Sequence, residues 1–174
     1  MFVLGIDPGL SRCGYGAVRV LADGRVAAEA AGVIRTDVAA PLPRRLSVLL
    51  GDVRSLLEEL RPDAVAVEKV FFQTNVRTAM SVGQASGIAL ALADEMGCEV
   101  AEYTANEVKS VVAGYGAATK EQVQRMVQTQ LGLAAPPRPP DAADALALAL
   151  THASLGPRRA RLQSAAAQPA GGRL

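Results

Sequence analysis

The sequence predicts an α/β domain in which a five-stranded mixed sheet is flanked by helices. Two patterns lead to this fold class. The first 35 residues consist of apolar segments separated by short turn signals, which is typical of neighbouring antiparallel strands. The later residues alternate between short apolar strands and segments with apolar residues three or four positions apart, which is typical of helices. The antiparallel start argues against a purely parallel, doubly wound sheet.

Three strands open the chain. Residues 2–7 are a continuous apolar run that stops at the turn signal Pro8-Gly9, and residues 13–20 follow as a second strand. Asp23-Gly24 is a strong hairpin signal, so residues 25–35 are expected to form the third strand.

Helices and strands alternate in the rest of the chain. Leucines and valines at helical spacing predict a helix over residues 46–60 that ends before Pro62. Two capping boxes, which begin at Thr104 and Thr119, predict the starts of two later helices. The other expected elements are strands at 64–68 and 99–103, a helix at about 75–96 and a last helix at about 141–155.

Bulk composition narrows the classes of function. The chain has 174 residues, half of them hydrophobic, which fits one domain with a buried core. No apolar run approaches the roughly 20 residues of a membrane span, and no basic lead precedes the apolar N-terminus. The two cysteines are far apart and there is one histidine, which leaves little room for a zinc site or a Ser-His-Asp enzyme. We expect a soluble, cytoplasmic protein.

Charge is distributed unevenly along the chain. The net charge is +1, but residues 156–174 carry four arginines and no acid, which leaves 14 basic and 17 acidic residues in residues 1–155. We expect residues 1–155 to form the folded domain and residues 156–174 to be a disordered, Arg- and Ala-rich tail. A body with a charge of −3 can bind nucleic acid if its acids gather around metal ions that neutralise them.

Four carboxylates are candidates for such a metal site. Asp7 and Glu68 each end an apolar strand, and Asp141 and Asp144 share one face at the start of a helix. Oxygen ligands suit Mg²⁺ or Mn²⁺, and two ions about 4 Å apart can support phosphoryl displacement. Exposed strand ends would explain the first two acids equally well, and helix capping would explain the second pair. Spacing alone leaves these alternatives open.

Four segments, taken in order, resemble the RuvC family of Holliday-junction resolvases. The resemblance covers roughly residues 1–155 and implies a ribonuclease H-like fold. The segments are Gly5-Ile6-Asp7-Pro8-Gly9 with Gly14-Tyr15-Gly16, Val67-Glu68-Lys69-Val70-Phe71, Val112-Ala113-Gly114-Tyr115-Gly116-Ala117-Ala118-Thr119-Lys120, and Asp141-Ala142-Ala143-Asp144-Ala145-Leu146-Ala147.

The resemblance further implies a function and a catalytic site. The protein would resolve Holliday junctions in recombination and repair by paired, symmetric nicks that leave 5′-phosphate and 3′-hydroxyl ends. Asp7, Glu68, Asp141 and Asp144 would hold two Mg²⁺ ions, for which Mn²⁺ could substitute.

Contacts with DNA are implied by the same resemblance. An aromatic residue at the position of Phe71 would wedge against unpaired bases, where stacking is worth roughly 1 to 3 kcal/mol per base. Lys109 and Lys120 match basic positions near the scissile phosphate. Core packing of the phenylalanines and plain solvation of the lysines remain alternatives. The candidate DNA-binding residues are Phe71, Phe72, Arg77, Lys109, Tyr115 and Lys120.

The resemblance also implies partners. A four-way junction has near two-fold symmetry, so a homodimer can present two equivalent sites to opposing strands. Gly83 and Gly87, four residues apart on one helix, either contribute to that interface or pack against their own sheet. A branch-migration helicase complex is a further expected partner.

Other functions compete with this interpretation. A related ribonuclease H-like nuclease acting on RNA or on other branched DNA would keep the four acids. A catalytically inactive junction-binding module is disfavoured because all four acids are present. An actin-like ATPase or kinase would need a second domain, which 174 residues do not provide.

Overall fold

The computed structural model describes the backbone of residues 1–69 and 76–167 and the side chains of residues 1–69 and 79–156. Within these ranges the predicted strands and helices occur in the predicted order, with small shifts at their ends. The elements are β1 (Phe2–Asp7), β2 (Arg12–Val20), β3 (Val26–Arg35), α1 (Leu42–Leu60), β4 (Ala64–Glu68), α2 (Val76–Glu95), β5 (Glu99–Tyr103), α3 (Ala105–Ala113), α4 (Lys120–Gln130) and α5 (Pro140–Ala167).

The five strands form one mixed sheet in the order β3-β2-β1-β4-β5. The first three strands pair antiparallel, whereas β4 pairs parallel with both β1 and β5. The predicted five-stranded mixed sheet is therefore confirmed, and the parallel pair β1 and β4 occupies its centre.

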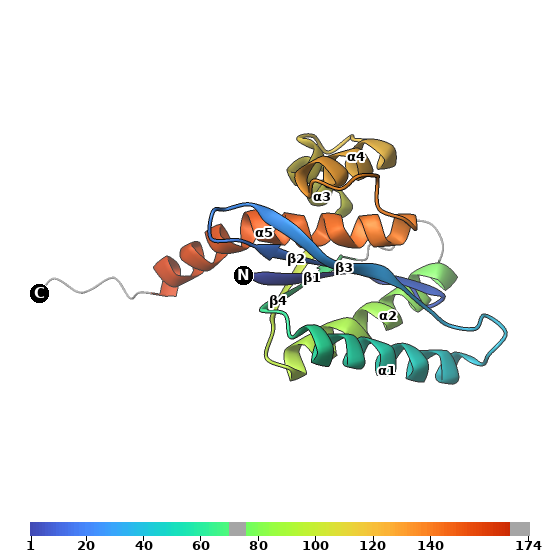
Figure 1. The fold of residues 1–174 in the computed structure, drawn as a ribbon. Helices are drawn as coiled ribbons and strands as arrows, with labels where there is room; N and C mark the ends of the chain where they lie inside the picture. The colour runs from blue at the N-terminus through green and yellow to red at the C-terminus, as the bar shows by residue number, and fades with distance from the viewer. Residues whose placement is uncertain (70–75, 168–174) are drawn as a thin grey trace, which may run out of the picture.

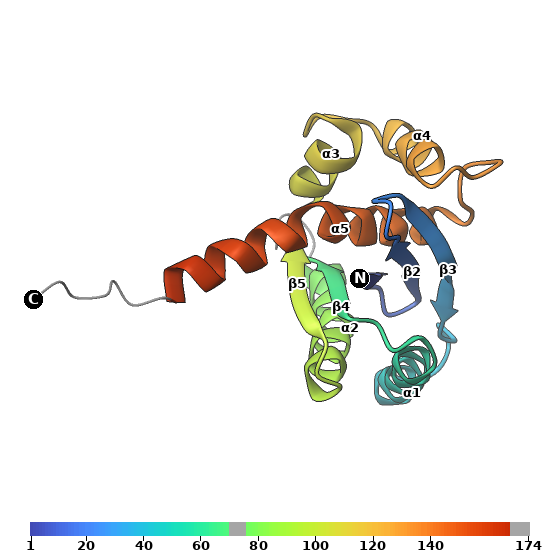
Figure 2. The ribbon, with the colours of Figure 1, turned by 60° about the vertical axis from the view of Figure 1, so that its left-hand side comes forward.

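Helices cover both faces of the sheet (Figure 1). Helices α1 and α2 lie on one face, and α5 crosses the other face with α3 and α4 stacked over it (Figure 2). Strand alternation divides the core in the same way. Leu4 and Ile6 belong to the hydrophobic cluster under α1 and α2, whereas Val3 belongs to the cluster under α5.

The last helix is longer than predicted. α5 continues to Ala167, so the expected helix end at about residue 155 is wrong, and residues 156–167 are helical rather than disordered. Apolar periodicity stops near residue 156, but seven of the ten residues 158–167 are Ala or Arg, which have high intrinsic helix propensity. Residues 168–174 lie outside the described residues.

Gly83 and Gly87 do not pack closely against their own sheet. A Cβ atom built at either position would have no neighbour within 4 Å among the described residues. The buried side of α2 is formed instead by Ala85 and Ala89. The exposed side chain of Met80 lies three and seven residues before the two glycines and shares their helix face. Among the residues that the structure describes, none covers this face of α2 at the two glycines.

None of the described helices is long and apolar enough to cross a membrane.

Candidate active site

Asp7 and Glu68 end the two central strands side by side. The parallel register pairs Ile6 with Val67, so the two acids occupy the next positions along β1 and β4. Asp7 points to the same face as Val3 and Glu68 to the same face as Ala66, because side chains alternate along a strand. That face is the one that α5 covers. The strand pairing therefore brings both acids to the end of the sheet beneath α5.

Two glycines let α5 lie directly on the strands. A Cβ atom at Gly5 would collide with the carbonyl oxygen of Ala145, and one at Gly14 would collide with the carbonyl oxygen of Asp141. The helix backbone therefore approaches more closely than any larger residue would permit. This approach places the first turns of α5, with Asp141 and Asp144, beside the end of β1.

A pocket of about 250 Å³ lies where these elements meet. Asp7, Glu68 and Asp144 line it together with Lys109 from α3 and Lys120 from α4. Asp141 is not among the residues that line this pocket. The apolar wall of the pocket is formed by Ala105, Val108, Val123, Ala147 and Leu148.

Proton affinity is unusual at the two strand-end acids. Burial, and to a lesser degree the nearby carboxylates of Glu68 and Asp144, together raise the pKa of Asp7 to about 7. Burial also raises the pKa of Glu68, although a side-chain hydrogen bond with Asp7 opposes the change. The two carboxyls therefore share a proton near neutral pH, which avoids placing two adjacent charges in a partly buried site.

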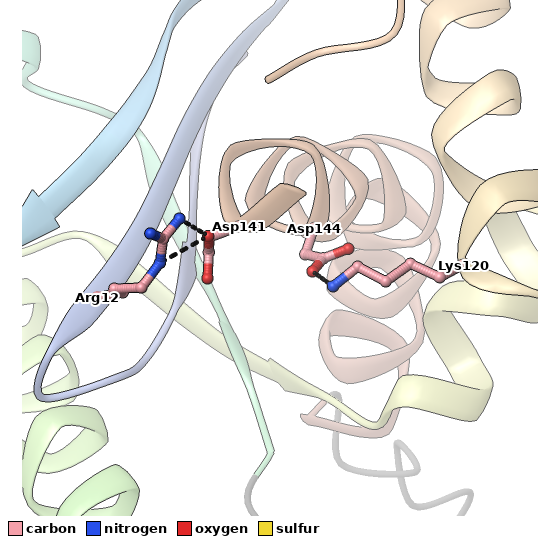
Figure 3. Close-up of polar contacts among 4 residues, drawn as sticks. All are labelled: Arg12, Lys120, Asp141 and Asp144. Atoms are coloured by element: carbon pink, nitrogen blue, oxygen red, sulfur yellow. Dashed lines mark hydrogen bonds and ion pairs between the residues drawn. The ribbon is translucent and has the colours of Figure 1, made fainter. Parts of the chain in front are cut away.

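The two acids of α5 are instead bound by basic side chains (Figure 3). Arg12 Nη2 lies 2.5 Å from Asp141 Oδ2, and Lys120 Nζ lies 2.5 Å from Asp144 Oδ2. The hydrogen bond from Arg12 lowers the pKa of Asp141. Burial raises the pKa of Asp144, with Lys120 opposing the change. Burial lowers the pKa of Lys120, but the hydrogen bond to Asp144 and the negative charges of the nearby carboxylates together outweigh this effect, so the pKa is raised overall.

The donor atoms suit a hard divalent cation, because all four acids supply oxygen and no sulfur or imidazole intervenes. As the side chains stand, however, no three acidic, histidine or cysteine residues among those described converge closely enough to hold a metal ion. Two of the four carboxylates are each turned to a basic partner. Loading a metal at this site therefore requires some of these side chains to change partners.

The predicted DNA-binding residues differ in their position relative to the pocket. Lys109 and Lys120 line the pocket, as a role near a phosphate requires. Tyr115 is not part of its lining: its ring is exposed and its hydroxyl donates to Gln122 Oε1 at 2.6 Å. Phe71 and Phe72 lie outside the described residues, as does the side chain of Arg77.

Arg12 is a residue of this region that the sequence reasoning missed. Arg12 lies between Gly9 and Gly14, so the antiparallel pairing of the first two strands would have placed it near Asp7. Its contact with Asp141, 129 residues away, had no sequence signal.

The sheet order, the helix across its face and the acids at the end of its central strands define a ribonuclease H-like domain. Residues 3–152 match the family described as crossover junction endodeoxyribonuclease RuvC, and the chain belongs to this family.

Relatives support this assignment in sequence and in structure. The chain is 51% identical to the crossover junction endodeoxyribonuclease RuvC of Moorella thermoacetica, over 92% of this chain and 96% of that protein. The Thermus thermophilus RuvC structure superposes with a TM-score of 0.84 at 40% identity, over 91% of this chain and 97% of that one. T. thermophilus RuvC in complex with Holliday junction substrate gives a TM-score of 0.82 at 38% identity, over 91% and 96% of the two chains.

Proposed function

We propose that this protein is a metal-dependent endonuclease that resolves Holliday junctions by paired nicks in recombination and repair. One observation carries the proposal: the fold gathers Asp7, Glu68, Asp144 and Lys120 in a single pocket. The family assignment supports it, and a solved relative, T. thermophilus RuvC, is in complex with Holliday junction substrate. The reaction would be hydrolysis of a phosphodiester bond that leaves 5′-phosphate and 3′-hydroxyl ends.

Asp7, Glu68, Asp141 and Asp144 would hold the metal, which we take to be two Mg²⁺ ions replaceable by Mn²⁺. When bound, such ions activate water and stabilise the negative charge that develops on the departing oxygen. The shared proton of Asp7 and Glu68 must leave before both acids can act as ligands. Metal binding is therefore expected to weaken as the pH falls below neutral.

Lys109 and Lys120 would supply positive charge to the phosphate of the cut strand. Both side chains line the pocket that contains the acids. The pKa of Lys120 is raised, so its ammonium group stays charged near neutral pH. A preorganised cation at this position stabilises the transition state more than the ground state, because charge builds up during the reaction.

Further DNA contacts would lie outside the pocket. Phe71 and Phe72 follow Glu68 closely in sequence, so aromatic rings from this segment would reach DNA bases next to the cut. The exposed ring of Tyr115 and the basic side chain of Arg77 are the other proposed contacts.

The active form would be a homodimer. The open face of α2, with Met80, Gly83 and Gly87, supports an interface there, because small residues allow a second backbone to approach closely. A symmetric pair would place two identical pockets against opposing strands of one junction. A branch-migration helicase complex is the proposed functional partner.

The test is nicking of a synthetic four-way junction and a matched linear duplex by the full-length protein, with Mg²⁺ or with EDTA. We expect paired, symmetric, ligatable nicks in the junction alone, and none with EDTA. Equal cutting of both DNAs would indicate a general nuclease. Tight junction binding without cutting would indicate a binding module.

A further inference from the structure

Arg12 forms a specific long-range contact with Asp141. It is the first residue of β2, and its side chain reaches the first turn of α5. Its Nε and Nη2 atoms lie 3.2 and 2.5 Å from the same carboxylate oxygen, Asp141 Oδ2. The pair lies at the rim of the site, with 40% of the Arg12 side chain and 27% of the Asp141 side chain exposed.

The contact engages the Asp141 carboxylate outside the lining of the pocket that the other three acids share. Arg12 and Lys120 approach the first turns of α5 from opposite sides (Figure 3). Asp144, bound to Lys120, lines the pocket with Asp7 and Glu68, whereas Asp141, bound to Arg12, is not part of that lining. Asp141 must leave Arg12 to join the other three acids around a metal ion.

The backbone around Arg12 is fixed, so only the side chain has to move. Thr36 N donates to the carbonyl oxygen of Ser11 at 3.3 Å. Arg45 from α1 donates to Ser11 Oγ at 2.6 Å and to Thr36 Oγ1 at 3.0 Å. A rotation of the exposed arginine side chain would therefore release Asp141 without disturbing the sheet.

We propose that Arg12 is a counter-ion that competes with the metal for Asp141, and that the displaced guanidinium then binds a backbone phosphate of the DNA. This inference rests on the proposed metal-dependent nuclease function. A guanidinium beside a divalent cation is repelled by it, whereas phosphate offers oxygen acceptors matched to the arginine fork. A metal bound to Asp141 leaves Arg12 available for phosphate, and phosphate bound to Arg12 leaves Asp141 available for the metal. Metal binding and DNA binding therefore favour one another.

Competition between Arg12 and the metal for Asp141 is tested without DNA. Binding of Mn²⁺ to the full-length protein is followed by the loss of the free-ion electron paramagnetic resonance signal. We expect Arg12→Gln to bind Mn²⁺ roughly two- to fivefold more tightly, the range that an exposed ion pair of this kind supports. Arg54→Gln is the matched control, because Arg54 forms an exposed pair with Glu95 on the α1–α2 side of the sheet.

A double-variant cycle separates competition from a general charge effect. In the Asp141→Asn background, Arg12→Gln should leave Mn²⁺ affinity unchanged. Weaker Mn²⁺ binding by Arg12→Gln would mean that Arg12 orients Asp141 as a ligand, and would overturn the proposal. An equal gain in both backgrounds would overturn it as well.

The contact of Arg12 with a DNA phosphate is tested in EDTA with a synthetic four-way junction. Asp141→Asn frees Arg12 and should steepen the dependence of junction affinity on salt by about one ion equivalent. Adding Arg12→Gln should abolish that increase; an increase that survives would refute the phosphate contact. Failure of the nuclease proposal would be recognised separately, as the absence of nicking by the wild-type protein with Mg²⁺.

Discussion

Replacing Asp7 with asparagine is expected to stabilise the metal-free protein while abolishing nicking. The pKa of Asp7 is raised from 3.8 to about 7, mainly by burial. Each tenfold change in proton affinity corresponds to about 1.4 kcal/mol, so ionising Asp7 in the folded protein at pH 8 costs about 4 kcal/mol. Asparagine removes this charge but keeps only part of the hydrogen bonding to Glu68. We therefore expect a gain of about 2 kcal/mol, or a rise in Tm of roughly 4 to 8 °C.

The pH dependence of this gain follows from the direction of the pKa change. The folded chain holds the Asp7 proton more tightly than the unfolded chain. The resulting stability is complete below a pH of about 3.8 and is lost as the pH rises through about 7. The advantage of Asp7→Asn should thus be small at pH 5 and complete at pH 8.

The assay is thermal unfolding in EDTA at both pH values, followed by circular dichroism. Asp52→Asn is the control, because Asp52 is an exposed acid on α1, far from the pocket. An Asp7→Asn variant that is no more stable than the wild type at pH 8, or whose gain in Tm is as large at pH 5, would refute a raised pKa of Asp7 beside Glu68.

Three further predictions concern the contact of α5 with Gly14, the role of Lys120 and the proposed dimer interface. Gly14→Ala should lower Tm and abolish nicking, since the added methyl collides with the Asp141 carbonyl; unchanged activity would mean that α5 can shift freely. Lys120→Met should reduce the single-turnover nicking rate at least about tenfold in a variant that still unfolds cooperatively; a rate equal to that of the wild type would exclude Lys120 from catalysis. Met80→Asp should convert the proposed dimer to monomer in sedimentation equilibrium with little change in monomer stability, because Met80 is exposed in the single chain; a persistent dimer would place the interface elsewhere.

The sequence predicted the features of this fold that depend on local pattern. Strand ends at Asp7 and Glu68 could be read from apolar runs and turn signals, and the capping boxes at Thr104 and Thr119 mark the helix starts that were expected. The family resemblance then grouped the four acids as one candidate site, and the structure places three of them, Asp7, Glu68 and Asp144, in one pocket.

Features that depend on tertiary contact were not predictable in this way. The pairing of Arg12 with Asp141 depends on how α5 sits against β2, which no local spacing encodes. The open face at Gly83 and Gly87 could not be distinguished from a packed face, because glycine is compatible with both. The end of α5 was misplaced because apolar periodicity reports burial, whereas helix formation in residues 156–167 rests on intrinsic propensity.

The seating of α5 on Gly5 and Gly14 has a consequence for how this protein tolerates sequence change. The helix that bears Asp141 and Asp144 contacts main chain at these points, not interlocking side chains. Substitutions among the apolar residues beneath α1 and α2 can therefore alter stability and packing on one side of the sheet while the spacing between α5 and β1 is held by backbone contact. Substitutions in the layer under α1 and α2 should therefore change the melting temperature before they change the positions of the carboxylates on the other face.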